Sequence, residues 1–305
     1  MWRYYTLRFL HLVVAPLPTP VGVAIFDALS AVVFVLARES RANLEANLRH
    51  VLPNADAKTI RRVARASFRN QGRNYYDLLR APRMTREHLA RRVQFDHVDN
   101  LEAARSRGKG VIVASAHLGN LDLVTQSAPL INMELVVLAE RLKPQKVCDF
   151  VMKLRTARGL EFVVADAGGI KSAFRALRDG KFVGLACDRM IQGQGMTIPF
   201  LGQSAVMPVG VAELALRTGA TVLPAFSIRT GSDSYRVVFE APITVERPSG
   251  YNEDDVQALA VRILEPVERN IRAYPSQWMA FQPVWRASPA TAMTERDGLA
   301  VGEAA

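Results

Sequence analysis

The chain alternates between two hydrophobic patterns from about residue 93 onward, and this alternation limits the possible folds more than any other feature. Short apolar runs rich in β-branched residues predict strands at 110–116, 135–139, 161–165, 182–187, 221–227 and 235–239. Segments of helical periodicity lie between or after them, at 122–131, 145–157, 170–178, 210–218 and 256–273. Such alternation is typical of α/β proteins, so we expect a mixed central β-sheet flanked by helices.

The first 37 residues are strongly apolar. Aromatic residues interleaved with Arg3 and Arg8 are followed by an apolar stretch of 17 residues, 21–37, interrupted by Asp27. A bilayer span needs about 20 apolar residues, and an acid near its middle is costly. We therefore expect segment 1–37 to lie at a membrane interface. A core helix and a single membrane span are the alternatives.

The positive charge follows directly on this apolar segment. The net charge is +10, and residues 38–92 hold fourteen Lys or Arg against five acids. This basic part is helical in pattern, with breaks at 52–54 and 81–83. Next to an apolar segment it favours contact with anionic lipid headgroups, each basic residue adding roughly 1 kcal/mol. Nucleic-acid binding has little support, because no aromatic-studded sheet accompanies the basic residues.

The predicted organisation has three parts. Segment 1–37 holds membrane-associating helices, 38–285 is one large domain, and 286–305 is a disordered tail rich in Ala, Thr and Glu. The large domain divides into the basic helical part 38–92 and an α/β core, 93–285. Its two cysteines lie far apart without metal-ligand spacing, so a reducing compartment fits and no metal is expected.

His117 and Asp122 are the leading catalytic candidates. His117 directly follows the predicted strand 110–116, and Asp122 lies at the start of the next helix. Strand ends of this kind carry the chemistry in α/β folds, and a carboxylate beside an imidazole favours a general base. The alternative is a turn histidine followed by an Asp that the helix dipole favours.

A second polar pair, Asp188 and Arg189, ends the predicted strand 182–187. The guanidinium could hold a phosphate or carboxylate of a substrate, although a local ion pair fits the spacing equally well. The apolar turn 197–202 could line a groove or simply pack. The chain has no phosphate-binding loop, nucleophile elbow or HExxH metal motif.

Five motifs in order make the sequence recognisable: SAHLGNLD, GGIKSAFRALRDGKFVGLACDRM, TIPFLG, AELALRTGATVLPAF and YPSQWMAFQPVW. Together they resemble the HtrB/LpxL-type bacterial lysophospholipid acyltransferase superfamily over residues 1–285. That group includes the lipid A late acyltransferases and the phosphatidylinositol mannoside acyltransferases. The closing WMAFQPVW and the pair Asp188-Arg189 look more like the mannoside branch. Met196 and Thr197 stand where that branch often carries an acid, which leaves the acceptor open.

The resemblance implies a glycerol-3-phosphate acyltransferase-like fold and a reaction without cofactor. His117 would be the general base and Asp122 its orienting partner. An acyl chain would pass from acyl-CoA or acyl carrier protein to a glycolipid hydroxyl. The expected substrate-binding residues are Asn120, Asp188, Arg189, Lys143 and Lys146. Backbone N–H groups of residues 118–120 or Arg189 would stabilise the oxyanion, and residues 198–201, Leu118 and Leu121 would line the acyl channel.

The resemblance also implies a location and partners. The protein is expected on the cytoplasmic face of the cell inner membrane, peripheral or single-pass, as a monomer acting on phospholipid or glycolipid. A phosphatidylinositol mannoside-like acceptor is the first expectation. A lipid A-type acceptor (Kdo2-lipid IVA, receiving a lauroyl or myristoyl chain) is the alternative. A non-catalytic membrane lipid-binding protein is the alternative of another class.

Overall fold

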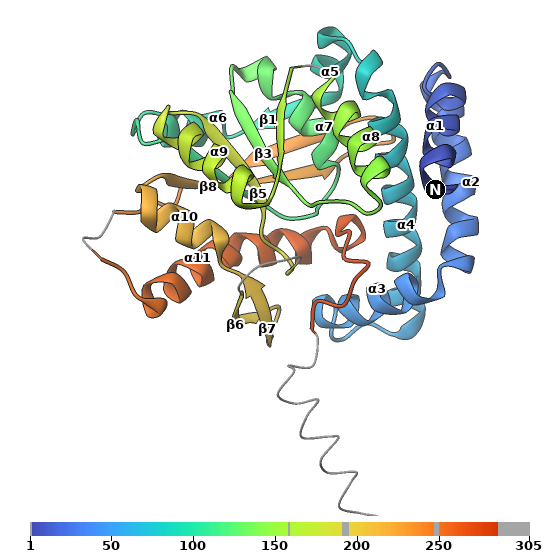
Figure 1. Cartoon of the computed structure of the whole chain (residues 1–305). Helices are drawn as coiled ribbons and strands as arrows, with labels where there is room; N and C mark the ends of the chain where they lie inside the picture. The colour runs from blue at the N-terminus through green and yellow to red at the C-terminus, as the bar shows by residue number, and fades with distance from the viewer. Residues whose placement is uncertain (1, 158, 191–194, 247–249, 286–305) are drawn as a thin grey trace, which may run out of the picture.

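The computed structural model describes residues 2–157, 159–190, 195–246 and 250–285. The predicted disordered tail, 286–305, lies outside the described residues. The chain begins with a run of helices and continues into an α/β core (Figure 1). The opening helices are α1 (Trp2–Val14), α2 (Thr19–Leu36), α3 (Arg38–Val51), α4 (Ala57–Arg80), η1 (Ala81–Arg83) and α5 (Arg86–Arg92). The predicted breaks at 52–54 and 81–83 are confirmed.

A seven-stranded sheet forms the centre of the α/β core. Its strands are β1 (Val93–Asp96), β2 (Val111–Ser115), β3 (Leu135–Ala139), β4 (Glu161–Val164), β5 (Phe182–Ala186), β8 (Thr221–Arg229) and β9 (Tyr235–Phe239). They lie in the order β1-β9-β8-β2-β5-β3-β4. Strands β2, β3, β4, β5 and β8 are parallel, whereas β9 runs antiparallel to β8 and β1 runs with β9. The expected α/β sheet and its six predicted strands are confirmed.

Helices cover both faces of the sheet. The remaining ones are α6 (Val98–Arg105), α7 (Leu121–Gln126), η2 (Ala128–Ile131), α8 (Gln145–Thr156), α9 (Ala167–Arg178), α10 (Gly210–Thr218), α11 (Glu253–Ala273) and η3 (Pro275–Gln277). One core cluster joins the sheet to α9, α10 and α11, and a second joins its other face to α6 and α7. A two-stranded hairpin, β6 (Gly195–Phe200) and β7 (Gln203–Pro208), stands apart from the main sheet.

Several elements differ from the sequence expectation, which contained neither helix α6 nor strand β7. The apolar turn expected at 197–202 is instead most of β6 and the tight turn that follows it, since Leu201 and Gly202 have positive φ. Strand β1 was not predicted, because only four residues pair with β9 and two of these are half-buried. So short a segment has too weak a hydrophobic pattern to stand out.

Helix α4 joins the N-terminal helices to the core. Figure 1 shows α1 and α2 on the outer side of α4, away from the sheet. Gly22 of α2 allows a close approach, because a Cβ there would lie 2.1 Å from the Tyr76 ring. Asp27 points to α4 and forms two hydrogen bonds of 2.6 and 2.7 Å with Arg73. The negative charge of Asp27, within the apolar stretch, is therefore neutralised by Arg73 of α4.

The opposite side of these two helices is apolar and exposed. We call it the α1–α2 apolar face, and its residues are Tyr5, Phe9, Leu12, Val13, Val21, Ile25, Leu29, Val32, Val33, Val35 and Leu36. Helix α2 is, by length and composition, able to cross a membrane. In the structure it lies along α4, with Phe26 and Phe34 buried and Leu36 73% exposed. A group of exposed large apolar side chains on two helices of this kind is typical of an interaction surface.

Candidate active site

His117 and Asp188 meet where two central strands end. His117 lies just after β2 and Asp188 just after β5, and these strands pair in parallel at the middle of the sheet. The Asp188 Oδ1 atom lies 2.8 Å from His117 Nδ1 and accepts the His117 backbone N–H at 3.0 Å. The carboxyl ends of adjacent parallel strands are the common site for ligands and catalysis in such sheets.

Asp188 is fully buried, and its polar neighbours keep it ionised. Its second oxygen accepts a hydrogen bond of 2.8 Å from the indole N–H of Trp278. Burial alone would raise the pKa of this carboxyl, but His117, Arg189 and Trp278 outweigh it and lower the pKa from 3.8 to about 2. A permanent anion at this place fixes the proton on Nδ1 of the imidazole and leaves Nε2 as a proton acceptor.

Residues 116–120, between β2 and α7, form the loop that carries His117, which we call the histidine loop. Residues 277–279, at the end of η3 and just after it, hold this loop through backbone hydrogen bonds. The Met279 N–H donates to the His117 carbonyl at 2.8 Å, and the Gly119 N–H donates to the Gln277 carbonyl at 2.9 Å. Trp278 lies between these two bonds and is completely buried. The closing motif WMAFQPVW therefore contacts the site directly. In the sequence this motif indicated only a resemblance to a family.

Asp122 does not orient His117. Its carboxylate forms hydrogen bonds of 2.6 and 3.2 Å with the guanidinium of Arg155 on α8. The reason is geometric: Asp122 is in the first turn of α7, which directs it to α8, whereas the imidazole turns to the end of β5. Burial lowers the pKa of Arg155, but the Asp122 carboxylate outweighs this and raises it. The expected partner of His117 is thus replaced by Asp188, which the sequence assigned to substrate.

Asn120 is buried and fully engaged within the protein. Its Oδ1 accepts the Leu123 N–H at the start of α7, and its Nδ2 donates to Asp77 at 2.8 Å. Its backbone N–H donates to Ser227 Oγ at 3.1 Å. The N–H groups of Leu118 and Gly119 are also used internally, by Ala116 and Gln277. The oxyanion donors expected at residues 118–120 are therefore not free in this structure.

A cavity of about 810 Å³ opens beside His117. The polar groups around it include Asp122, Arg155, Arg189 and Glu140. An apolar region formed by β1, β2, η2, β3 and β9 is lined by Phe95, Val113, Ala128, Met133, Leu135, Val237 and Phe239. A volume in the range of about 300–1,000 Å³ is typical of sites for small ligands. The cavity combines an imidazole, guanidinium groups and a long apolar surface.

Of the other expected site residues, some line this cavity and others do not. Arg189 lines it, 3.8 Å from Glu140, and its buried Nε has no hydrogen-bond partner among the described residues. Lys143 and Lys146 do not line it. Leu121 lines the cavity, whereas Leu118, Ile198, Phe200 and Leu201 are core residues that do not line it, and Pro199 is exposed. The predicted channel lining was therefore wrong at those positions.

Comparison with known proteins gives a consistent result. A family described as "Bacterial lipid A biosynthesis acyltransferase" matches residues 1–287. The chain belongs to this acyltransferase family. It is 32% identical over 252 residues to a phosphatidylinositol mannoside acyltransferase of Mycobacterium tuberculosis (strain CDC 1551 / Oshkosh), covering 80% of this chain and 77% of the relative. A protein of the same name from Mycolicibacterium smegmatis is 28% identical, with 79% and 78% covered.

As a member of the bacterial lipid A biosynthesis acyltransferase family, the chain is an acyltransferase. The match extends across the N-terminal helices as well as the α/β core, so the family pattern includes both parts. The sequence resemblance to this group is confirmed.

Proposed function

We propose that this acyltransferase moves a fatty acyl chain from an acyl thioester to a hydroxyl of a membrane glycolipid, with His117 as general base. One observation carries the proposal. The His117 imidazole is hydrogen-bonded through Nδ1 to a buried carboxylate, and it borders a cavity with a large apolar region. A base and a place for an acyl chain are thus side by side.

The reaction needs no covalent intermediate with the enzyme. Nε2 of His117 takes the proton of the acceptor hydroxyl as its oxygen attacks the thioester carbonyl carbon. The C–S bond then breaks, and the imidazolium returns the proton to the leaving thiolate. Throughout, Asp188 stays ionised and stabilises the positive imidazolium.

The developing oxyanion requires hydrogen-bond donors inside the cavity. Arg189 and Arg155 both line it, and the Nε of Arg189 is without a hydrogen-bond partner among the described residues. We assign the oxyanion to the Arg189 side of the cavity, with Arg155 held in place by Asp122. The same guanidinium groups suit the phosphates of acyl-CoA or the phosphopantetheine of acyl carrier protein.

The acyl chain would lie in the apolar region of the cavity. Val113 and Leu135 line it from neighbouring parts of the sheet, and Phe95 and Phe239 line it from β1 and β9. Burial of apolar surface contributes roughly 25 cal/mol per Å², so a long chain gains much of its binding energy there. The far end of a fatty acyl chain has no polar group, so it needs no hydrogen-bond partner in this region.

The acceptor that we propose is phosphatidylinositol mannoside-like. The relatives described above carry that activity in their names. The closing WMAFQPVW motif, which is part of the resemblance to that branch, contacts the His117–Asp188 pair through Trp278. The family description favours a second candidate, a lipid A-type acceptor such as Kdo2-lipid IVA.

The α1–α2 apolar face supports action at a membrane surface. We propose that it lies in the headgroup region of the cytoplasmic leaflet of the inner membrane, as a peripheral attachment. Arg65 and Arg69 of α4 are exposed in the same helical part of the chain and suit anionic headgroups. This position would keep the enzyme at the surface that holds its glycolipid acceptor.

The test is acyl transfer by the purified chain, followed by mass spectrometry of the products. Acyl-CoA is supplied with phosphatidylinositol mannoside, with Kdo2-lipid IVA, or with no acceptor, in mixed lipid vesicles. We expect acylated phosphatidylinositol mannoside from the wild type. We expect the rate to fall about 10²–10⁴-fold in His117→Ala, because the general base is lost.

His97→Asn is the matched control. His97 is an exposed histidine with a φ of 56°, a conformation that Asn adopts readily, so this variant should keep wild-type activity. Transfer to Kdo2-lipid IVA alone would replace the proposed acceptor by the second candidate. Lipid binding without turnover by the wild type would favour a non-catalytic lipid-binding protein, and full activity of His117→Ala would refute the mechanism.

A further inference from the structure

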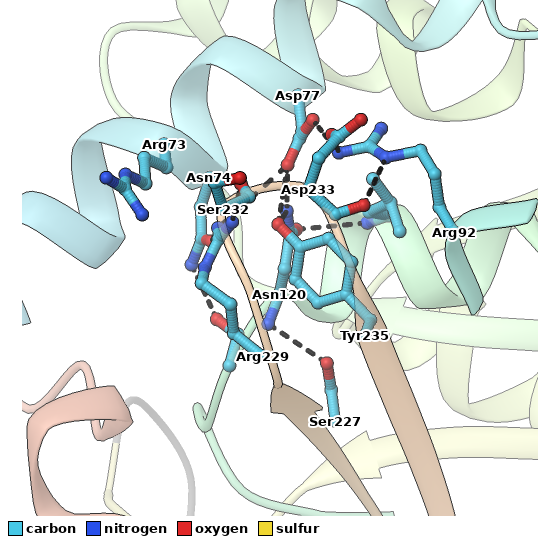
Figure 2. Close-up of polar contacts among 12 residues, drawn as sticks. Arg73, Asn74, Asp77, Arg92, Asn120, Ser227, Arg229, Ser232, Asp233 and Tyr235 are labelled. Carbon is cyan, nitrogen blue, oxygen red and sulfur yellow. Dashed lines mark hydrogen bonds and ion pairs between the residues drawn. The ribbon is translucent and has the colours of Figure 1, made fainter. Parts of the chain in front are cut away.

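A buried group of polar side chains lies behind the histidine loop, and of its members Asn74 and Asn120 also line the cavity. We call it the Asp77 cluster (Figure 2), and it comprises Asn74, Asp77, Arg92, Asn120, Arg229 and Tyr235. Its members come from α4, α5, the loop before α7, the end of β8 and the start of β9. The cluster therefore connects five segments at the carboxyl ends of the parallel strands.

Asp77 is the acceptor at the centre of this cluster. Its Oδ1 accepts from Arg92 at 2.7 Å, and its Oδ2 accepts from Tyr235 at 2.7 Å and from Asn120 at 2.8 Å. The side chain is 3% exposed and does not line the cavity. Asp77 thus satisfies its oxygens entirely within the protein and cannot touch a substrate directly.

The hydrogen bond from Asn120 to Asp77 connects the cluster to the histidine loop. Asn120 stands three residues after His117, and its Oδ1 caps the first turn of α7. With Nδ2 held by Asp77 and the backbone N–H held by Ser227, the residue is fixed at three points. Asp77 is therefore one of the residues that fix the end of this loop.

A second residue of α4 acts in parallel. Asn74 Nδ2 donates to the Gly119 carbonyl at 2.5 Å, and its Oδ1 accepts from Arg229 at 2.8 Å. Asn74 and Asp77 are one helical turn apart, so the same face of α4 contacts two consecutive loop residues. The loop is held on one side by this face and on the other by residues 277–279.

Stability alone does not account for this arrangement. Buried ion pairs often add little to stability, since removing two charges from water offsets their attraction. The Arg92 guanidinium has a second carboxylate partner in Asp233, so Asp77 is not needed merely to neutralise it. What Asp77 adds is an acceptor for Asn120, the residue that ties the histidine loop to α7, and for the Tyr235 hydroxyl, which itself accepts from Asn120 at 3.1 Å.

We propose that Asp77 is a positioning residue, which holds Asn120 and thereby fixes the His117 loop in its reactive geometry. This rests on the proposed acyltransferase mechanism. Misplacement of a reacting group by about 1 Å costs on the order of 10²-fold in rate. Because Asp77 lies outside the cavity, its loss should lower kcat while KM changes by less than about twofold.

The test exchanges the two side chains that share the bond. Asp77→Asn places two amide groups at the contact, and Asn120→Asp places two carboxylates there. Each single variant should lose about 10²-fold in kcat. The double variant, Asp77→Asn with Asn120→Asp, restores an N–H donor opposite a carboxylate acceptor and keeps an acceptor for the α7 cap. It should recover at least tenfold over either single variant, with KM unchanged.

Glu240→Gln is the control for loss of a half-buried charge elsewhere. Glu240 accepts from Asn270 at 2.6 Å just after β9, at the end of the sheet away from His117, so kcat should stay at the wild-type value. If Asp77→Asn lowers only the melting temperature or the yield of folded protein, with kcat per folded molecule unchanged, the proposal is wrong. A double variant no more active than the singles would also overturn it.

A measurement without turnover separates this proposal from the proposed function. Hydrogen–deuterium exchange of the folded chain should become faster over residues 117–123 in Asp77→Asn. Unchanged exchange in this segment would refute the positioning role. Faster exchange combined with an inactive wild type would instead refute the acyl-transfer mechanism while leaving the link between Asp77 and the loop intact.

Discussion

Asp188 is a carboxylate without solvent contact, and yet its pKa lies below the ordinary value. His117, Arg189 and Trp278 surround it and favour the ionised form more than burial opposes it. The same contacts that orient the imidazole therefore stabilise the folded chain whenever the carboxyl is ionised. Function and acid stability are linked through one side chain.

We expect this link in the pH dependence of unfolding. A carboxyl with a pKa of 3.8 unfolded and about 2 folded contributes about 2 kcal/mol above pH 4, and this contribution disappears as the pH falls towards 2. Asp188→Asn should lack that component. Its free energy of unfolding, measured by urea denaturation, should therefore decline less steeply than the wild type between pH 4 and pH 2.

Asp254→Asn provides the comparison for this experiment. Asp254 is an exposed acid in the first turn of α11, so its loss should leave the acid limb of the wild-type profile in place. A parallel decline in wild type and Asp188→Asn would mean that Asp188 does not carry the acid-sensitive stability.

The histidine loop is an element whose path only glycine permits. Gly119 has a φ of 64°, and a Cβ there would lie 2.1 Å from the Ser227 carbonyl oxygen. Backbone atoms cannot yield as a flexible side chain does, so the loop itself would have to move. The backbone of strand β8 therefore limits how the loop can be placed at Gly119, and His117 is only two residues away.

We predict that Gly119→Ala destabilises the fold by more than the conformational cost alone, which is about 1–2 kcal/mol. The displaced loop should also lower kcat for acyl transfer by at least tenfold. Gly108→Ala separates the two effects, because Gly108 has a φ of 67° and a Cβ added there would meet no atom within 4 Å. It should lose only the conformational part in thermal unfolding and keep full activity.

The elements themselves were largely predictable, but their meeting point was not. Strands 111–115 and 182–186 have clear β-branched patterns, and Pro53 and Pro82 mark real helix boundaries. His117 and Asp188, in contrast, are 71 residues apart, and their contact depends on β5 lying between β2 and β3. Periodicity reports which residues form a strand, not which strand becomes its neighbour. Local spacing therefore favoured Asp122.

Most of the exposed large apolar side chains among the described residues lie on α1 and α2. Figure 1 shows α1 and α2, the helices of the α1–α2 apolar face, on the outer side of α4, whereas the sheet lies on its inner side. His117 and Asp188 follow strands β2 and β5 of that sheet. Partial insertion of such a face into a bilayer gains up to roughly 1.5–3 kcal/mol for each large side chain that becomes fully buried. Attachment should therefore depend on several residues at once.

We predict that the triple variant Phe9→Ser, Leu12→Ser and Val32→Ser binds lipid vesicles at least tenfold more weakly, since tenfold corresponds to only about 1.4 kcal/mol. All three side chains are more than half exposed, so the fold should be preserved. Co-sedimentation with vesicles containing anionic phospholipid measures the effect. Val206→Ser, at an exposed apolar residue of the β6–β7 hairpin, should bind as the wild type does; equal binding of the triple variant would exclude this face as the contact.

Helix α4 contacts both the N-terminal helices and the histidine loop. One face of it holds α2 through Arg73 and Tyr76, and the adjoining face holds the loop through Asn74 and Asp77. Figure 2 shows Arg73 pointing away from the cluster formed by its neighbours. A chain shortened to begin after α2 would leave Arg73 without its Asp27 partner and Tyr76 uncovered on the helix that supports catalysis. A search for inhibitors of this enzyme should therefore use the chain with its first two helices in place.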